Sequence, residues 1–490
     1  MAIDTDLFFA RRLGVGLGAS ESLPEKPREW AMDQLRSVPP LDFFDKKGNS
    51  IAGTLPPYAK LIDNFEEAAK TFDTYFTAKT KRMLASKNMA NDDFNKLMAS
   101  EIFLPYNDAP IWRDTVVNTL TAVNGKSGVF ERFWMFWCNH FAVATTAADI
   151  ALYWGPHMRT IRDRMTGKFA DMLYDAVSSP AMLTYLNNTD SVGPHSRGAH
   201  DPNRPQHDLN ENLGRELLEL HSVSPAAGYT QADVTETAML LTGWRVYAGP
   251  GDARRPKPEP NFGTIFEAVI HEPGPRTVMG KAYTPKGDGR NMLRELTDDL
   301  AAHPATAQHL AAKLARAFLA DTPPQDSIDR IAKAYTETGG DMVALHSAVV
   351  EEVLAHGQQY SKMTTPQNWL IQAYRATGAR VAIGSPERGG NVESLPLIYK
   401  EIGQILNDPA QPNGYSDLKA DWLSKAMLDR RTRQAYRIGS VAFDLTVEAI
   451  GAYAERLAGI DSSLVPMIKR AESRPIAVAV LLASPQFLKI

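Results

Sequence analysis

Apolar residues recur every three or four positions along most of the chain, which is the spacing of one face of an α-helix. Between residues 153 and 177 the apolar positions with this spacing are Met158, Ile161, Met165, Phe169 and Leu173. Similar patterns predict helices at 29–35, 64–100, 109–123, 128–144, 230–242 and 364–378, and further helices within 290–355, 392–406 and 417–490. The chain is therefore predicted to be mainly α, a multi-helix globular array.

One segment departs from the helical spacing. In residues 265–283, the runs FEAVIH and RTVMGKAY lie on either side of the chain-breaking sequence EPGP. Two short runs rich in β-forming residues around a four-residue turn predict a short β-hairpin.

The length of 490 residues exceeds one ordinary hydrophobic core. We expect four regions: an N-terminal helical subdomain at 1–186, a central region of loop, helices and linker at 187–260, the hairpin at 261–285, and a C-terminal helical subdomain at 286–490.

The segment 208–221, DLNENLGRELLELH, carries two different stripes on one predicted helix. The apolar face consists of Leu209, Leu213, Leu217 and Leu220. The polar stripe consists of Asn212, Arg215, Glu216 and Glu219. Asp208 and Glu211 form an N-capping pattern, and Arg215 is spaced for an ion pair with Glu219. The polar stripe is either a solvated surface or part of a site, and spacing alone favours the solvated surface.

His140 falls on the same helical face as Phe133, Phe136 and Trp137, so it is predicted to point into an aromatic core. Each nitrogen of a buried imidazole needs a hydrogen-bond partner. A carboxylate or a metal ion would serve, and so would the carbonyl oxygen of an ordinary core histidine.

A polar loop at 187–207 holds three more histidines, His195, His200 and His207, among aspartates. Nitrogen and oxygen ligands of this kind bind divalent metals, but the spacing matches no established zinc pattern. An ordinary polar loop is therefore the favoured interpretation. His271 with Glu272 stands at the turn of the predicted hairpin, where a side chain can face a cleft.

Composition and motifs exclude several classes of protein. The net charge of −4 argues against a nucleic-acid or anionic-membrane partner, and the single cysteine, Cys138, excludes an intramolecular disulfide. No apolar run is long enough for a membrane span, and the N-terminus predicts a first helix instead of a signal peptide. A cytoplasmic location is expected, with a periplasmic one as the alternative. The common nucleotide-binding, hydrolase and metalloprotease motifs are absent from the sequence.

Several motifs in order nevertheless resemble a known bacterial family, the "eighteen-hundred" family of domains of unknown function. They include ERFWMFWCNHFAV, NENLGRELLELH, GYTQADVTETAMLLTGW, HEPGPRTVMG and HPATAQHLAAKLARAFLADTPP, and they continue to LLASPQFL near the C-terminus. The resemblance covers essentially the whole chain. It implies a predominantly helical protein whose partner is a sulfatase-like protein.

The resemblance also changes the weight of particular residues. The polar positions that fit the family's motifs are His140, Asn210, Glu211, Asn212, Arg215, Glu216, Glu219 and His271. This chain departs from the pattern at Cys138, where the family usually has a histidine, and at Tyr415, where it usually has tryptophan.

Two hypotheses follow. In the first, the chain is a metal-dependent enzyme with a polar helical cleft and one divalent metal. Its catalytic residues would be His140, Arg215, Glu216 and Glu219, and its metal ligands would come from His140, Glu216, Glu219, His221 and His271. In the second, the chain is a non-enzymatic binding or assembly partner of a sulfatase-like protein, and the same residues form a structural network.

Overall fold

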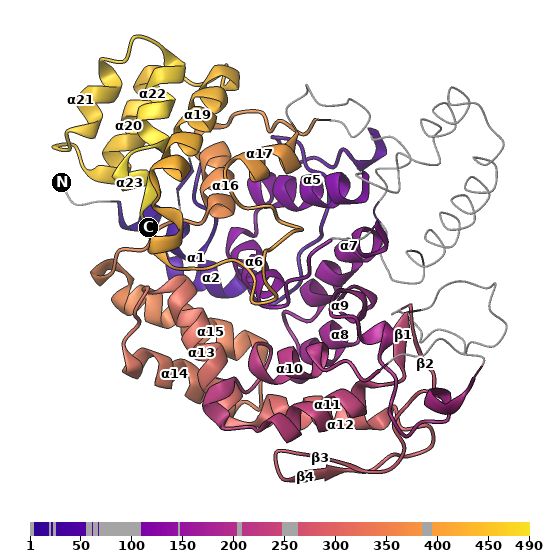
Figure 1. Ribbon diagram of the computed structural model, residues 1–490. Helices are drawn as coiled ribbons and strands as arrows, with labels where there is room; N and C mark the ends of the chain where they lie inside the picture. The colour runs from indigo at the N-terminus through magenta and orange to yellow at the C-terminus, as the bar shows by residue number, and fades with distance from the viewer. Residues whose placement is uncertain are drawn as a thin grey trace, which may run out of the picture.

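The computed structural model describes residues 4–18, 21–22, 26–54, 61, 67, 109–145, 148–202, 208–246, 263–384 and 394–490. It confirms the predicted class, because helices make up most of these residues and the strands are short (Figure 1). The predicted helix at 64–100 lies, apart from residue 67, outside the described residues. In the described part of the chain, no helix is long and apolar enough to cross a membrane.

The described residues in the first part of the chain are mainly helical. The helices are α1 (Thr5–Leu13), α2 (Pro27–Gln34), α5 (Ala109–Asn124), α6 (Gly128–His140), α7 (Ala148–Asp163), α8 (Phe169–Val177) and α9 (Pro180–Tyr185). The single helix expected at 153–177 is thus two helices. The chain turns between α7 and α8, where Lys168 forms a β-bridge with Asp341, so a tertiary contact interrupts the helical pattern.

The central part combines two helices with two small antiparallel sheets. Its elements are α10 (Asn212–Glu219), α11 (Gln231–Leu241), β1 (Trp244–Val246), β2 (Thr264–Phe266), β3 (Arg276–Val278) and β4 (Lys281–Tyr283). A hairpin lies in the predicted range, but it is formed by β3 and β4 around Met279 and Gly280, both with positive φ. The sequence EPGP is therefore not the hairpin turn, because β2 pairs with β1.

The remaining helices include several that begin with a side-chain cap. They are α12 (Asn291–Ala302), α13 (Pro304–Phe318), α14 (Gln325–Glu337), α15 (Met342–His356), α16 (Pro366–Thr377), α17 (Leu395–Glu401), α18 (Lys419–Trp422), α19 (Lys425–Val441), α20 (Val447–Ala458), α21 (Leu464–Lys469), α22 (Arg474–Leu482) and α23 (Pro485–Leu488). The side chains of Asp341, Thr365, Ser424 and Thr446 each accept a hydrogen bond from the backbone of the first turn.

Two hydrophobic clusters hold these elements together. The first joins α2, α6 to α15 and the strands, which occupy the lower half of Figure 1. The second joins α5 with α16 to α23 in the upper half of Figure 1. Helix α1 contributes to both, with Phe9 and Leu13 in the first cluster and Leu7 and Ala10 in the second.

Candidate functional site

The C-terminal end of α6 places His140 inside the first hydrophobic cluster. His140 is 1% exposed, and its ring centre lies 5.3 Å from that of Trp137 and 4.5 Å from that of Phe141. This confirms that His140 points into an aromatic core. The helix was predicted to run to residue 144, whereas it ends at His140. The imidazole faces Lys313 on α13 and His221 in the turn after α10.

Both ring nitrogens of His140 have partners. Nδ1 lies 2.9 Å from the Nζ of Lys313 on α13, and Nε2 lies 3.3 Å from the backbone oxygen of His221. A lysine ammonium only donates, so Nδ1 accepts and Nε2–H donates, which fixes the neutral tautomer. The carbonyl partner matches the ordinary core-histidine interpretation, whereas the lysine partner was not predicted.

Two further histidines complete the group. His221 is fully buried, and neither of its ring nitrogens has a hydrogen-bond partner. Its ring centre lies 5.8 Å from that of His140, and the ring of half-buried His309 lies 6.4 Å from His140 on another side. The Nε2 of His309 donates to the backbone oxygen of Leu220 at 3.1 Å. We call His140, His221, His309 and Lys313 the histidine–lysine cluster.

Burial keeps the imidazoles of this cluster neutral. Desolvation, followed by the charge of Lys313, lowers the pKa of His221 to about 3 and that of His309 to about 4, and moves the pKa of His140 well below its usual value. Desolvation also lowers the pKa of Lys313 to about 8. At neutral pH the cluster therefore carries one ammonium charge surrounded by three neutral imidazoles.

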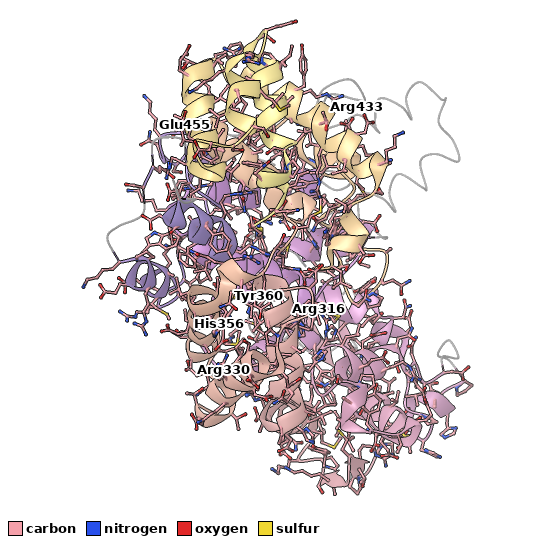
Figure 2. The ribbon with its side chains drawn as sticks, turned by 90° about the vertical axis from the view of Figure 1, so that its left-hand side faces the viewer. Arg316, Arg330, His356, Tyr360, Arg433 and Glu455 are labelled. Carbon is pink, nitrogen blue, oxygen red and sulfur yellow. The ribbon has the colours of Figure 1, made fainter. Side chains whose placement is uncertain are left out.

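Two charged side chains act on Lys313 from a distance, the carboxylate of Asp417 and, less strongly, the guanidinium of Arg316. Arg316 follows Lys313 by three residues on α13, is exposed, and is labelled in Figure 2. Its charge lowers the pKa of both Lys313 and His309, and Asp417 is the carboxylate that acts in the opposite direction on Lys313. Lys313 forms no ion pair with any residue of the described ranges, so its charge is not directly neutralised.

The helix α10 is shorter than the predicted segment 208–221. It begins at Asn212, and Glu211, in the N-cap position, makes no side-chain cap. The predicted cap at Asp208 is wrong, because the side chain of Asn210 accepts the hydrogen bond from the backbone nitrogen of Asn212 in a turn before the helix.

Arg215 belongs to a polar network between α10 and α11. It pairs with Glu211 at 3.1 Å. The predicted pair with Glu219 is therefore wrong. The carboxylate of Glu211 also accepts hydrogen bonds from Gln231 and Thr235 on α11. These contacts join α10 to α11. Arg215 therefore takes part in helix packing and does not contact His140.

Glu216 and Glu219 are both half-buried on α10, close to the start of the turn that carries His221. Burial, and then the charge of Glu219, raises the pKa of Glu216. The hydroxyl of Tyr229 lies 3.5 Å from the carboxylate of Glu219. Through its backbone oxygen, Glu216 accepts hydrogen bonds from Leu220 and His221.

His271 belongs to a different part of the molecule. Its Nδ1 lies 2.7 Å from the backbone oxygen of Thr242, and its ring packs against Phe266. Gly289 has a positive φ of 97°, and a Cβ atom there would lie 2.6 Å from the Nε2 of His271. The structure therefore brings His140 and His221 together, but places His271 in the packing between β2 and the turn before α12.

The polar loop is held by the carboxylate of Glu272. This side chain is 2% exposed and accepts hydrogen bonds from both the backbone nitrogen and the Nδ1 of His195. His200 is exposed, and His207 lies outside the described residues. Over the residues that the structure describes, no group of three or more His, Cys, Asp or Glu side chains is arranged to hold a metal ion.

A small cavity of about 50 Å³ lies beside α6. Cys138, Asn139 and Phe141 line it together with residues from α5, α7 and the segment around Tyr415. Burial raises the pKa of the Cys138 thiol, which keeps it protonated. The backbone of Tyr415 makes two hydrogen bonds with the side chain of Asn139 at the edge of this cavity. Its oxygen accepts from the amide nitrogen, and its N–H donates to the amide oxygen.

One known family matches nearly the whole chain. The model of the family described as "Protein of unknown function (DUF1800)" matches residues 24–489. The chain belongs to this family. The match includes α6, α10 and α13, which supply the histidine–lysine cluster, so the cluster lies within the family's common region. No curated protein and no solved structure shows significant similarity to the chain.

Proposed function

We propose that the chain is an enzyme, and that the histidine–lysine cluster binds an anionic group of the substrate and transfers protons to and from it. The observation that carries the proposal is the bond of 2.9 Å between Lys313 Nζ and His140 Nδ1. A buried lysine in a purely structural role normally pairs with a carboxylate, whereas this one bonds to a neutral imidazole.

An anionic substrate would supply the charge that the cluster lacks. Lys313 and His309 are both half-buried, so they lie nearer the surface than His140 and His221. A carboxylate, phosphate or sulfate group approaching α13 would meet the ammonium of Lys313 and the guanidinium of Arg316 first. The imidazoles behind them would then lie next to the bound group.

Proton transfer follows from the ionisation states. With a pKa of about 8, Lys313 releases its proton to a bound substrate more readily than an ordinary lysine would, while the Nδ1 of His140 accepts its hydrogen bond and holds it in place. Glu216 is the proposed acid on α10, because burial, and then the charge of Glu219 beside it, raises its pKa. Arg215 holds α10 against α11 in this proposal and does not contact the substrate.

A divalent metal is no part of the proposed steps. Neutral imidazoles are suitable ligands, and His140, His221 and His309 lie close together. However, the nitrogens of His140 face Lys313 and a carbonyl oxygen, and the predicted ligand His271 is packed elsewhere. Elemental analysis of the purified protein tests this choice, and a stoichiometric metal that is lost in His221→Ala would restore the metal-dependent hypothesis.

Binding of simple anions tests the proposal directly. Calorimetric titrations with sulfate, phosphate and acetate should show one site in the wild type. Lys313→Met should lose that site, whereas Lys333→Met should keep it, because Lys333 is an exposed lysine on α14 paired with Glu337. Equal binding by Lys313→Met and wild type, or no binding by either, would contradict the proposal.

A second candidate function is partner binding. The exposed large hydrophobic side chains of the described residues all lie in the segment 397–476: Leu397, Leu418, Leu423, Tyr436, Val441, Phe443, Ile460, Met467 and Ile476. Phe443, at 75%, is the most exposed of them. Exposed apolar side chains mark an interaction surface where they join into one patch, and a sulfatase-like protein is the partner implied by the family resemblance. Co-purification that is lost in Phe443→Ser, with the fold retained, would support this function.

A further inference from the structure

Arg431 is a buried cation that has no hydrogen-bond acceptor among the residues that the structure describes. It lies on the face of α19 that packs against α16 and α22, and it is fully buried. None of its three guanidinium nitrogens has a hydrogen-bond acceptor. The nearest aromatic contact is with Trp369 on α16, whose ring centre lies 5.9 Å from the guanidinium carbon.

Other buried arginines of the described chain are neutralised or bonded. Arg162 donates to both carboxylate oxygens of Glu131, and Arg11 donates to Gln372 and to three backbone oxygens. Arg12 leaves only its Nε without an acceptor. Arg431 is thus unlike them, because its whole guanidinium group lacks acceptors.

This arrangement is unfavourable unless something else accepts the hydrogen bonds. A guanidinium group has five N–H donors and stays charged under all ordinary conditions. A cation in a dry interior without a counter-charge loses its solvation. The contact with the Trp369 ring, at 5.9 Å, accepts no hydrogen bond in the plane of the guanidinium and offsets only a part of this loss.

A second buried polar group lies next to Trp369 in the sequence. Asn368 is 1% exposed, and both its amide nitrogen and its amide oxygen lack partners. Helix α16 therefore carries a second buried polar side chain without a partner among the described residues. The guanidinium of Arg431 is the group that can donate hydrogen bonds to a guest at the Trp369 contact.

We infer that Arg431 is the binding site of a small inorganic anion held between α16 and α19. An anion supplies both the missing acceptors and the missing charge, whereas water supplies acceptors alone. Because the residue is fully buried, the anion is of chloride size. The site uses none of the residues of the histidine–lysine cluster, so it is independent of the proposed function.

Thermal unfolding in two salts of equal ionic strength tests this inference. Sodium chloride should raise the unfolding temperature of the wild type above its value in sodium gluconate, and the difference should saturate as the site fills. Arg431→Met should unfold at the same temperature in both salts. Arg430→Met is the matched control, since Arg430 is the exposed neighbour on the same helix, and it should retain the wild-type difference.

Two results would overturn the inference: a wild type that does not distinguish the two salts, or an Arg431→Met variant that keeps the full difference. Should Arg431→Met fail to fold, crystals of the wild type soaked in bromide give the answer. Anomalous scattering should show bromide within hydrogen-bond distance of the Arg431 guanidinium, and a featureless map at that position would refute the site.

Discussion

Two groups of buried charges in this molecule are built in opposite ways. On α5, the fully buried carboxylate of Asp114 lies 2.8 Å from Arg113 and 3.1 Å from Arg159 of α7. In the histidine–lysine cluster, the ammonium of Lys313 bonds to a neutral imidazole. The first group has opposite charges in contact, and the second has a cation with no carboxylate at ion-pair distance among the described residues.

This difference distinguishes a group of charges that holds helices together from a group that could bind a substrate. The carboxylate of Asp114 bonds to a guanidinium on its own helix and to one on α7, so these contacts join two helices. The cluster around Lys313 is left with one unbalanced charge and with the two unpartnered nitrogens of His221. An incomplete set of partners in a region that is half-open to solvent is what a substrate site requires.

The largest effect is expected at the group around Asp114. Asp114→Ala should lower the free energy of unfolding by about 3–5 kcal/mol, because it removes the buried carboxylate to which Arg113 and Arg159 both bond. Urea denaturation measures the loss. A loss below about 1 kcal/mol would show that Asp114 does not hold α5 and α7 together.

Lys313→Met should affect binding more than stability. Removing Lys313 sacrifices no ion pair and leaves only the Nδ1 of His140 without its donor, so the free energy of unfolding should fall by only about 1 kcal/mol. Affinity for sulfate should fall about 10- to 100-fold, the value of one charged hydrogen bond. Calorimetry and urea denaturation on the same sample give both values, and a large stability loss with unchanged sulfate affinity would make Lys313 a structural residue.

A smaller effect is expected in the network between α10 and α11. Glu211→Ala removes the acceptor of Arg215, Gln231 and Thr235 and should cost about 1 kcal/mol of stability. Sulfate affinity should not change, since none of these groups belongs to the cluster. A parallel loss of sulfate affinity would instead show that the contact between α10 and α11 supports the site.

The last effect concerns acid pH. The pKa of His309 in the folded chain is about 4, below the usual 6.5, so the unfolded chain binds more protons between these values. Stability is therefore lost as the pH falls from about 6.5 to about 4, and His309→Gln should lose less over this range. His200→Gln, at an exposed histidine of the polar loop, is the control. Identical pH slopes for His309→Gln and wild type would show that His309 is not buried as a neutral base.

The sequence allowed the helices to be predicted well where local pattern decides them. The helix starting after Thr230 has the expected capping box with Asp233, and 290–355 holds four helices, α12 to α15. Errors arose where distant contacts decide, as at Lys168 between α7 and α8 and in the pairing of β2 with β1. Those partners lie too far along the chain for periodicity to identify.

The candidate site was predicted only in part for the same reason. The aromatic pattern of α6 located His140, and the end of the 208–221 segment located His221. Lys313 is 173 residues away from His140, so its role could not be seen from spacing. One local signal was available: His309 and Lys313 are four residues apart on a helix whose neighbouring positions Leu310 and Leu314 are buried.

The pH dependence of sulfate binding tests most directly whether Lys313 is the unbalanced cation of this site. Sulfate keeps its charge over the whole range, so a change in affinity reports the protein's own ionisation. The account predicts that affinity is constant below about pH 8 and falls tenfold per pH unit above it, because Lys313 loses its proton with a pKa of about 8. An affinity that stays constant up to pH 10 would contradict it.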